Sequence, residues 1–107
     1  MALTDEEIGH ALELFEGVGP MTTRKMFGGL GIYAGGTIFA VMMSDGTIRL
    51  KGKGDMVARF EALGMEPWTY QREGQKASAM PYWALPASAL DDPEEASALA
   101  REALSHL

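Results

Sequence analysis

The stretch that decides the fold is Arg24-Lys25-Met26-Phe27-Gly28-Gly29-Leu30-Gly31-Ile32-Tyr33, which places three glycines inside a strand-like run. No catalytic residue types stand beside it. Glycine within a strand permits a bulge, a sharp bend or the close approach of another group. We therefore predict that Gly28-Gly29 bends or bulges one strand running from about Thr22 to Tyr33. Gly31 is predicted to leave space for a crossing backbone or an aromatic ring.

The letters Gly29-Leu30-Gly31-Ile32-Tyr33-Ala34 also match a dinucleotide-binding fingerprint. That motif requires a helix to begin at the glycines, so that its amides face a pyrophosphate, and an acidic residue about 20 positions further on. Here a turn and another strand are predicted, and the acidic residue is missing. We therefore favour the strand bend over a phosphate loop and expect no cofactor.

Turn signals and hydrophobic periodicity divide the rest of the chain. Glycine pairs with Asp or Ala mark hairpins, whereas apolar residues at helical spacing mark helices. The expected elements are a helix after Thr4, strands at Thr22–Tyr33, Thr37–Met43 and Thr47–Lys51, a short helix capped by Asp55, a hairpin of Trp68–Gln71 and Lys76–Trp83, and a helix capped by Asp92. This order, α-β(3)-α-β(2)-α, predicts a single α+β domain over residues 1–107 with an antiparallel sheet.

One hydrophobic core is expected. Thr4 and Glu7 have the spacing of a capping box at the start of the first helix. The predicted core residues are Ile8, Leu12, Phe15, Ile38, Ala40, Ile48, Leu50, Phe60, Leu99 and Leu104.

The second strand is apolar on both faces, which is typical of a central strand. Ile38, Ala40 and Met42 alternate with Phe39, Val41 and Met43. Because three short helices do not cover both sides of a five-stranded sheet, an apolar surface would remain exposed. We expect a symmetric homodimer through Phe39, Val41 and Met43, with Tyr33 beside them. The competing interpretation is a monomer whose helices split between the two faces.

Composition narrows the function classes. The chain has 107 residues, 47% of them apolar, and no cysteine, which excludes disulfides, thiol nucleophiles and thiolate metal sites. No apolar run approaches a membrane span, and the acidic N-terminus lacks a signal pattern, so we expect a cytoplasmic protein without membrane contact. The net charge of −6 opposes binding to phosphate backbones.

The charge is unevenly placed along the chain. Residues 21–60 carry six basic residues against two acidic ones, between acidic ends. Lys51 and Lys53, beside the start of the short helix, form a possible anion patch, although a charged sheet edge explains them more simply. A nucleic-acid-associated regulator using the basic segment from Arg24 to Arg59 is therefore the alternative function. Four aromatic residues, Trp68, Tyr70, Tyr82 and Trp83, would serve either as a base-stacking platform or as core and interface residues.

No enzyme is indicated. His10 falls opposite the apolar stripe of the first helix, and His106 is the penultimate residue. The acidic cluster Asp91, Asp92, Glu94 and Glu95 is explained by helix initiation, and no spacing resembles a metal site. We therefore expect no catalytic residues, no metal and no cofactor.

The chain resembles the N-terminal domain of the TfoX/Sxy competence regulators over nearly its whole length. The motif that carries the resemblance is Arg24, Lys25, Met26, Phe27, Gly28 and Gly29, followed by Gly31 and Tyr33. Phe39-Ala40, Leu50-Lys51, Gly64 before Pro67, and Tyr82 with Leu85-Pro86 are further landmarks. The resemblance implies an α+β fold similar to secretion chaperones.

The resemblance also implies a regulatory role. Two-domain members regulate competence genes for DNA uptake alongside the cyclic-AMP receptor activator, and they continue into a helical C-terminal domain where this sequence ends, at Leu107. The resemblance supplies no catalytic residues. We therefore expect a stand-alone, non-enzymatic domain that acts through protein contacts, as a homodimer or with another protein.

Overall fold

The computed structural model describes residues 3–26, 29–70 and 78–107. The helices in this part of the chain are α1 (Asp5–Leu14), η1 (Glu16–Val18), α2 (Asp55–Ala62), η2 (Ala87–Ala89) and α3 (Pro93–Leu104), where η denotes a single 3₁₀ turn. The strands are β1 (Thr22–Met26), β2 (Gly29–Ala34), β3 (Thr37–Met42), β4 (Ile48–Lys51), β5 (Pro67–Tyr70) and β6 (Ser78–Ala84).

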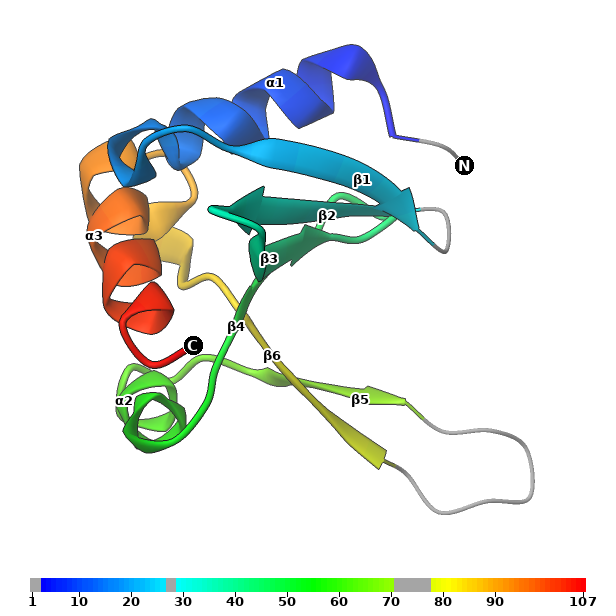
Figure 1. Ribbon diagram of the computed structural model, residues 1–107. Helices are drawn as coiled ribbons and strands as arrows, with labels where there is room; N and C mark the ends of the chain where they lie inside the picture. Colours follow the sequence, from blue (N-terminus) through cyan, green and yellow to red (C-terminus); the bar gives the residue numbers. More distant parts are fainter. Residues whose placement is uncertain (1–2, 27–28, 71–77) are drawn as a thin grey trace.

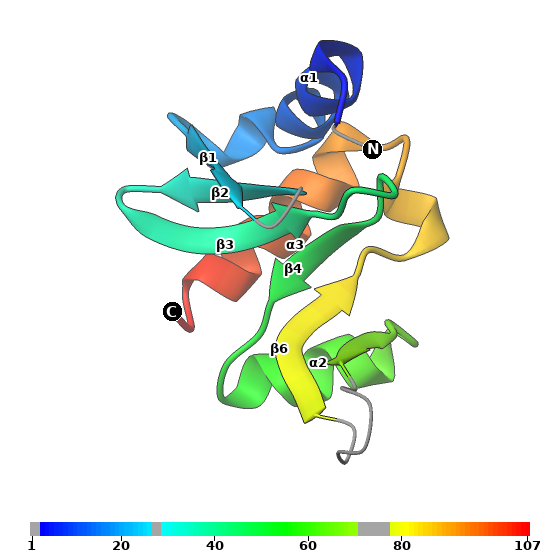
Figure 2. The ribbon, with the colours of Figure 1, turned by 90° about the vertical axis from the view of Figure 1, so that its right-hand side faces the viewer.

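The strands form one antiparallel sheet with the order β1-β2-β3-β4-β6-β5. Figures 1 and 2 show α1, α2 and α3 on the same side of this sheet. In Figure 2 the strands lie in front and α3 lies behind them. The α+β class with an antiparallel sheet, predicted from the sequence, is confirmed. The competing interpretation, in which the helices split between the two faces, is wrong, because one face carries all three.

The predicted single strand from Thr22 to Tyr33 is wrong in one respect. Residues 22–26 and 29–34 are two strands that pair antiparallel, with Met26 opposite Gly29. The glycine-rich segment therefore reverses the chain instead of bending one strand, and the sheet has six strands where five were expected. Phe27 and Gly28 themselves lie outside the described residues. Strand structure from Gly29 to Ala34 agrees with the rejection of a phosphate loop.

A β-bulge in β3 changes which side chains face the helices. Ile32 pairs with Ala40 but Tyr33 pairs with Ile38, so Phe39 is the extra residue. An extra residue interrupts the alternation of side chains between the two faces. Phe39 consequently joins Ala40 in the core, with its ring centroid 5.4 Å from that of Phe15. The sequence-based assignments of Ile38 to the core and Phe39 to an exposed interface are therefore wrong.

The core lies between the helices and the sheet. Phe15, Phe39 and Phe60 are fully buried, and Trp83 packs against Phe60 with ring centroids 5.5 Å apart. Of the ten predicted core residues, six are buried in one cluster: Phe15, Ala40, Ile48, Leu50, Phe60 and Leu99. Ile8, Leu12 and Leu104 pack against it while remaining partly exposed.

The helix ends follow the predicted capping rules with one exception. The Thr4 hydroxyl accepts from the Glu7 amide, and the Glu7 carboxylate accepts from the Thr4 amide, which is a complete capping box. Asp92 caps α3 through the amides of residues 94 and 95. At α2, however, Gly54 occupies the cap position with φ +61°, and Asp55 is the first helical residue, so the predicted Asp55 cap is wrong.

One buried serine joins the two ends of the chain. Ser97 of α3 is 3% exposed, and its Oγ donates to the Leu14 carbonyl oxygen at 2.8 Å. The Ser97 Oγ also accepts a hydrogen bond from the Gly17 amide at 3.1 Å. Both backbone groups lie where α1 ends, so Ser97 satisfies groups that a helix terminus leaves unpaired. These two hydrogen bonds therefore connect the C-terminal end of α1 to α3.

Among the described helices, none is both long and apolar enough to cross a membrane.

Candidate interaction face of the sheet

The side of the sheet opposite the helices carries the strongest candidate site, and we call it the outer face. Strand register places Arg24, Gly31, Val41 and Arg49 in one row across β1, β2, β3 and β4. An added Cβ on Gly31 would lie within 3.2 Å of Met26, Tyr33 and Ile38 atoms, so these side chains share that face. The outer-face side chains are Arg24, Met26, Tyr33, Ile38, Val41, Met43, Arg49, Lys51, Trp68 and Tyr82.

Gly31 performs the role predicted for it. The Cε1 atom of the Tyr33 ring lies 3.2 Å from the position that an added Cβ on Gly31 would take. The guanidinium carbon of Arg24 in turn lies 6.0 Å from the centroid of the Tyr33 ring, at the outer limit of a cation–π contact. The absence of a side chain at Gly31 therefore brings the Tyr33 ring and the Arg24 guanidinium close to the sheet.

An apolar groove opens on the outer face. It has a volume of about 170 Å³, and its walls come from β1 to β3 on one side and from β5 and β6 on the other. Met26, Val41 and Met43 line one wall, and Trp68 and Tyr82 line the other. The rings of Trp68 and Tyr82 meet edge to face with centroids 6.3 Å apart. The strands thus hold large apolar side chains together, and none of the described helices lies over them.

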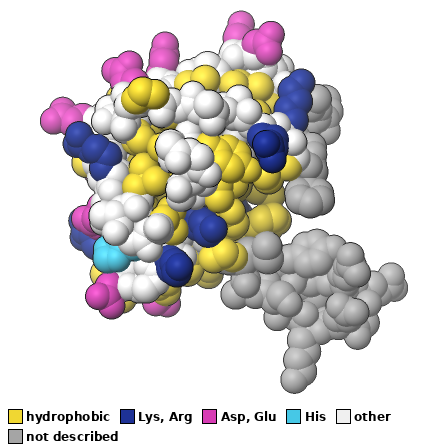
Figure 3. Space-filling model, in the orientation of Figure 1, with side chains coloured by type: hydrophobic (Ala, Val, Ile, Leu, Met, Phe, Trp, Pro, Cys, Tyr) yellow, Lys and Arg dark blue, Asp and Glu magenta, His cyan; other side chains and the backbone are white. Residues whose placement is uncertain are grey.

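Charge is segregated between the sheet and the rest of the molecule. The six strands contain four basic residues (Arg24, Lys25, Arg49 and Lys51) and no acidic residue. Every acidic residue that the structure describes lies outside these strands. In Figure 3 acidic side chains stand along the upper margin, where Figure 1 places α1, whereas hydrophobic and basic side chains occupy the middle of the view. The outer face is therefore positive on a protein whose net charge is negative.

Arg49 is held at the centre of this face. Its Nη1 donates to the Glu66 carbonyl oxygen over 3.4 Å, which is a long hydrogen bond. Its Nε is buried and has no hydrogen-bond partner among the described residues. Since the Arg49 guanidinium makes only this one long hydrogen bond within the described residues, it can still donate to a negatively charged group.

Burial of Tyr82 in the groove wall raises the pKa of its phenol above the ordinary value of 10.0, and the nearby Tyr33 raises it further. The folded protein therefore keeps this proton at a pH where the unfolded chain has lost it. The contribution of Tyr82 to the free energy of unfolding is fully present below about pH 10, where the phenol is protonated in both states. It is lost as the pH rises through the pKa of the phenol in the folded protein.

We expect an absorbance titration of tyrosinate to contain a component, from Tyr82, that ionises above the ordinary value. Tyr82→Phe should remove that component. A difference between wild type and Tyr82→Phe that titrates at the ordinary value would contradict the burial of this phenol.

The four aromatic residues that were considered as a base-stacking platform do not all lie on one face of the sheet. Trp68 and Tyr82 lie on the outer face, whereas Trp83 is buried on the helix side against Phe60. The side chain of Tyr70 lies outside the described residues. Four stacked aromatics on one surface are therefore not formed, because neighbouring residues of β6 point to opposite faces.

The remaining predicted residues occupy separate places. Arg24, Met26 and Tyr33 of the motif contribute to the outer face, while Lys25 is exposed on the edge strand β1. Lys51 lies in β4 opposite Tyr82, and Lys53 is exposed in the turn before α2. His10 is exposed as predicted, with Nε2 3.2 Å from the Leu90 carbonyl oxygen, and His106 is exposed at the end of the chain.

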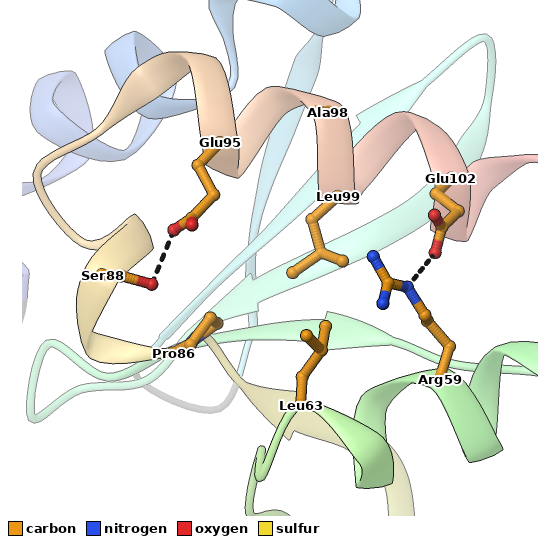
Figure 4. A pocket seen from close by; sticks show the side chains of 8 residues that line it. All are labelled: Arg59, Leu63, Pro86, Ser88, Glu95, Ala98, Leu99 and Glu102. Carbon is orange, nitrogen blue, oxygen red and sulfur yellow. Dashed lines mark hydrogen bonds and ion pairs between the residues drawn. The ribbon is translucent and has the colours of Figure 1, made fainter.

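A second cavity lies on the helix side (Figure 4). It has a volume of about 250 Å³ between α2, η2 and α3. Its polar groups pair with one another: Arg59 Nε lies 2.9 Å from Glu102 Oε2, and the Ser88 hydroxyl donates to Glu95 over 2.8 Å. These pairs join α2 and η2 to α3, which accounts for the cleft as part of the packing of the helix layer.

Sequence reasoning missed the contribution of Met26, Trp68 and Tyr82 to one apolar groove. Met26 and Trp68 are separated by more than forty positions in the sequence, and only the closure of the sheet brings them together. The signal available in the sequence was the absence of acidic residues from every predicted strand.

Comparison with known proteins gives one family and one similar curated protein. A model of the TfoX N-terminal domain matches residues 13–107. The DNA transformation protein TfoX1 of Aliivibrio fischeri is similar to the chain, with 30% identity over 77 residues. The match covers 68% of this chain and 36% of that protein, so the chain spans about a third of the relative's length.

Proposed function

Because this chain belongs to the TfoX N-terminal domain family, we propose that it is a non-enzymatic regulatory domain that acts through protein contacts. The outer face of the sheet is the surface we assign to those contacts. The process regulated is uptake of DNA, by analogy with the similar protein, whose name places it in DNA transformation. A regulator of this kind works in the cytoplasm.

A single observation carries the proposal. All three helices lie on one side of the sheet, while the other side presents an apolar groove between Met26, Met43 and Trp68. A contiguous apolar surface on a folded domain is typical of a contact site. The helix side, in contrast, offers a cleft whose polar groups are already paired.

A homodimer through the same face is the second candidate assembly. Tyr33, Val41 and Met43 of the interface expected from the sequence belong to the outer face, although Val41 is only 6% exposed. Two-fold pairing is the commonest way to cover such a surface. Sedimentation at micromolar concentration measures the mass: a dimer that Met43→Glu dissociates supports this assembly, and a monomer rules it out.

The test of the proposed function compares two double variants in the host organism. Met43→Ser/Trp68→Ser removes apolar side chains from the groove, whereas Leu63→Ser/Leu90→Ser removes the two large apolar side chains most exposed elsewhere, at 38% and 43%. Each is introduced into a strain from which the gene has been deleted. Transformation by added DNA and transcripts of DNA-uptake genes are measured.

We expect the groove variant to behave like the deletion and the control variant to behave like wild type. Both proteins must show wild-type thermal unfolding for the comparison to hold. If the two variants restored transformation of the deletion strain equally well, the outer face would not be the contact surface. A deletion that changes neither transformation nor transcripts would contradict the regulatory role itself.

A further inference from the structure

We propose that the outer face binds an acidic amphipathic helix of a partner protein. This inference rests on the proposed function, since it names the chemistry of the partner that the outer face contacts. The helix would place apolar side chains in the groove and carboxylates over the basic residues around it.

The first argument is charge complementarity. Arg24 and Arg49 stand three strand intervals apart in the same row, which is about 14 Å at the usual strand spacing. Lys51 adds a third basic residue on that face, one alternate position along β4 from Arg49. No acidic residue belongs to a described strand. The carboxylate of Asp45, in the exposed turn before β4, interacts electrostatically with Arg49, so partner carboxylates are expected mainly at Arg24 and Lys51. Opposite charge on the partner would speed encounter and set its orientation.

The second argument is the size and lining of the groove. A volume of about 170 Å³ is smaller than the roughly 300–1,000 Å³ of typical small-molecule sites, so it suits side chains better than a metabolite. Met26 and Met43 are flexible and adapt to the shape of an inserted side chain. A helix with apolar residues on one side and acidic ones beside them matches both properties.

Two other occupants fit less well. A second copy applied face to face would bring Arg24, Arg49 and Lys51 of one molecule against the same three residues of the other, and like charges repel. A DNA duplex is bound chiefly by cations, with six to ten phosphate contacts in a strongly salt-dependent complex. The outer face offers three cations around an apolar groove, on a protein of net charge −6.

The experiment uses two labelled helical peptides with leucines at positions i, i+3, i+4 and i+7. Glutamate fills the flanking positions in one peptide, and lysine fills them in the other. Binding is followed by fluorescence anisotropy at low and at physiological ionic strength. A labelled DNA duplex of mixed sequence is titrated in parallel.

The protein variants are matched in charge. Arg24→Glu/Lys51→Glu reverses two charges on the outer face, and Lys53→Glu/Arg101→Glu reverses two exposed charges elsewhere. Both change the net charge by the same amount. We expect the outer-face reversal to weaken binding of the acidic peptide about tenfold or more, and the control to change it less than about twofold. Met43→Ser/Trp68→Ser should weaken it as well, with the salt dependence unchanged.

Several results would overturn the inference. If the acidic and the lysine peptide bind with equal affinity, charge complementarity does not contribute to binding. If both charge-reversal variants lose the same affinity for the acidic peptide, the effect comes from the net charge of the protein and not from the outer face. A duplex that binds more tightly than the acidic peptide identifies nucleic acid as the ligand. A dimer mass that Met43→Glu abolishes identifies a second copy.

The proposed function fails separately from this inference. Suppose that the acidic peptide does not bind, but the strain carrying Met43→Ser/Trp68→Ser still behaves like the deletion strain. The partner is then not acidic, and the outer face remains the contact surface. If the strain carrying that variant behaves like wild type, the outer face is not the contact surface.

Discussion

Replacing Leu50 by alanine is expected to lower the free energy of unfolding by about 2–5 kcal/mol. Leu50 is fully buried in β4, where it pairs with Ala40 on one side and Trp83 on the other. Removing its side chain leaves a cavity between the sheet and the helix layer. Since small domains are stable by only about 5–15 kcal/mol, the loss is a large share of the total. Denaturant unfolding followed by circular dichroism measures it.

Leu63→Ala is the matched control for this substitution. Leu63 is 38% exposed at the end of α2, so the same truncation there should cost less than about 1 kcal/mol. A loss at Leu50 below about 1 kcal/mol in a two-state transition would place that residue outside the core.

Replacing Gly29 by alanine is expected to destabilise the fold by about 1–3 kcal/mol. An added Cβ would lie in impossible contact with the Met42 carbonyl oxygen, a backbone atom that belongs to β3. Backbone in the middle of a sheet moves only if the strand pairing around it moves. Thermal and denaturant unfolding of the variant test this.

Gly9→Ala provides a control with the opposite sign. An added Cβ at Gly9 meets no atom within 4 Å, and the residue lies inside α1. Alanine is favoured over glycine in a helix interior by about 0.5–1 kcal/mol, so this variant should be more stable than wild type. A Gly29→Ala protein as stable as Gly9→Ala would show that β2 and β3 are not tightly apposed.

Much of the fold could be predicted because its signals are local. The Thr4–Glu7 capping box, the Asp92 cap and the positive φ of Gly35, Gly36 and Gly46 at turns all depend on a few neighbouring residues. The errors have a different origin. Ile38 and Phe39 exchange faces because of one bulge, and no residue between Thr37 and Met42 marks it. Period-two alternation carries no information about an inserted residue.

The candidate site could be predicted only in part. Tyr33, Val41 and Met43 come from adjacent strands joined by short turns, and the alternation of β3 placed two of them on one face. Trp68 and Tyr82 belong to a hairpin at the other end of the sheet, and their position depends on β6 pairing with β4 across the α2 connection. Such pairing is a long-range event that composition and periodicity do not specify.

The contact of Ser97 with the end of α1 has a consequence for the synthesis of this protein. The two residues joined by the Ser97–Leu14 hydrogen bond are 83 positions apart, so the ribosome makes α1 long before α3. Until α3 has emerged, the apolar side of α1 lacks the helix against which it packs. Contacts of such long separation delay folding, and they leave a growing chain open to aggregation. The domain should therefore fold after its translation is complete, and ribosome-bound chains lacking residues 93–107 should be sensitive to protease.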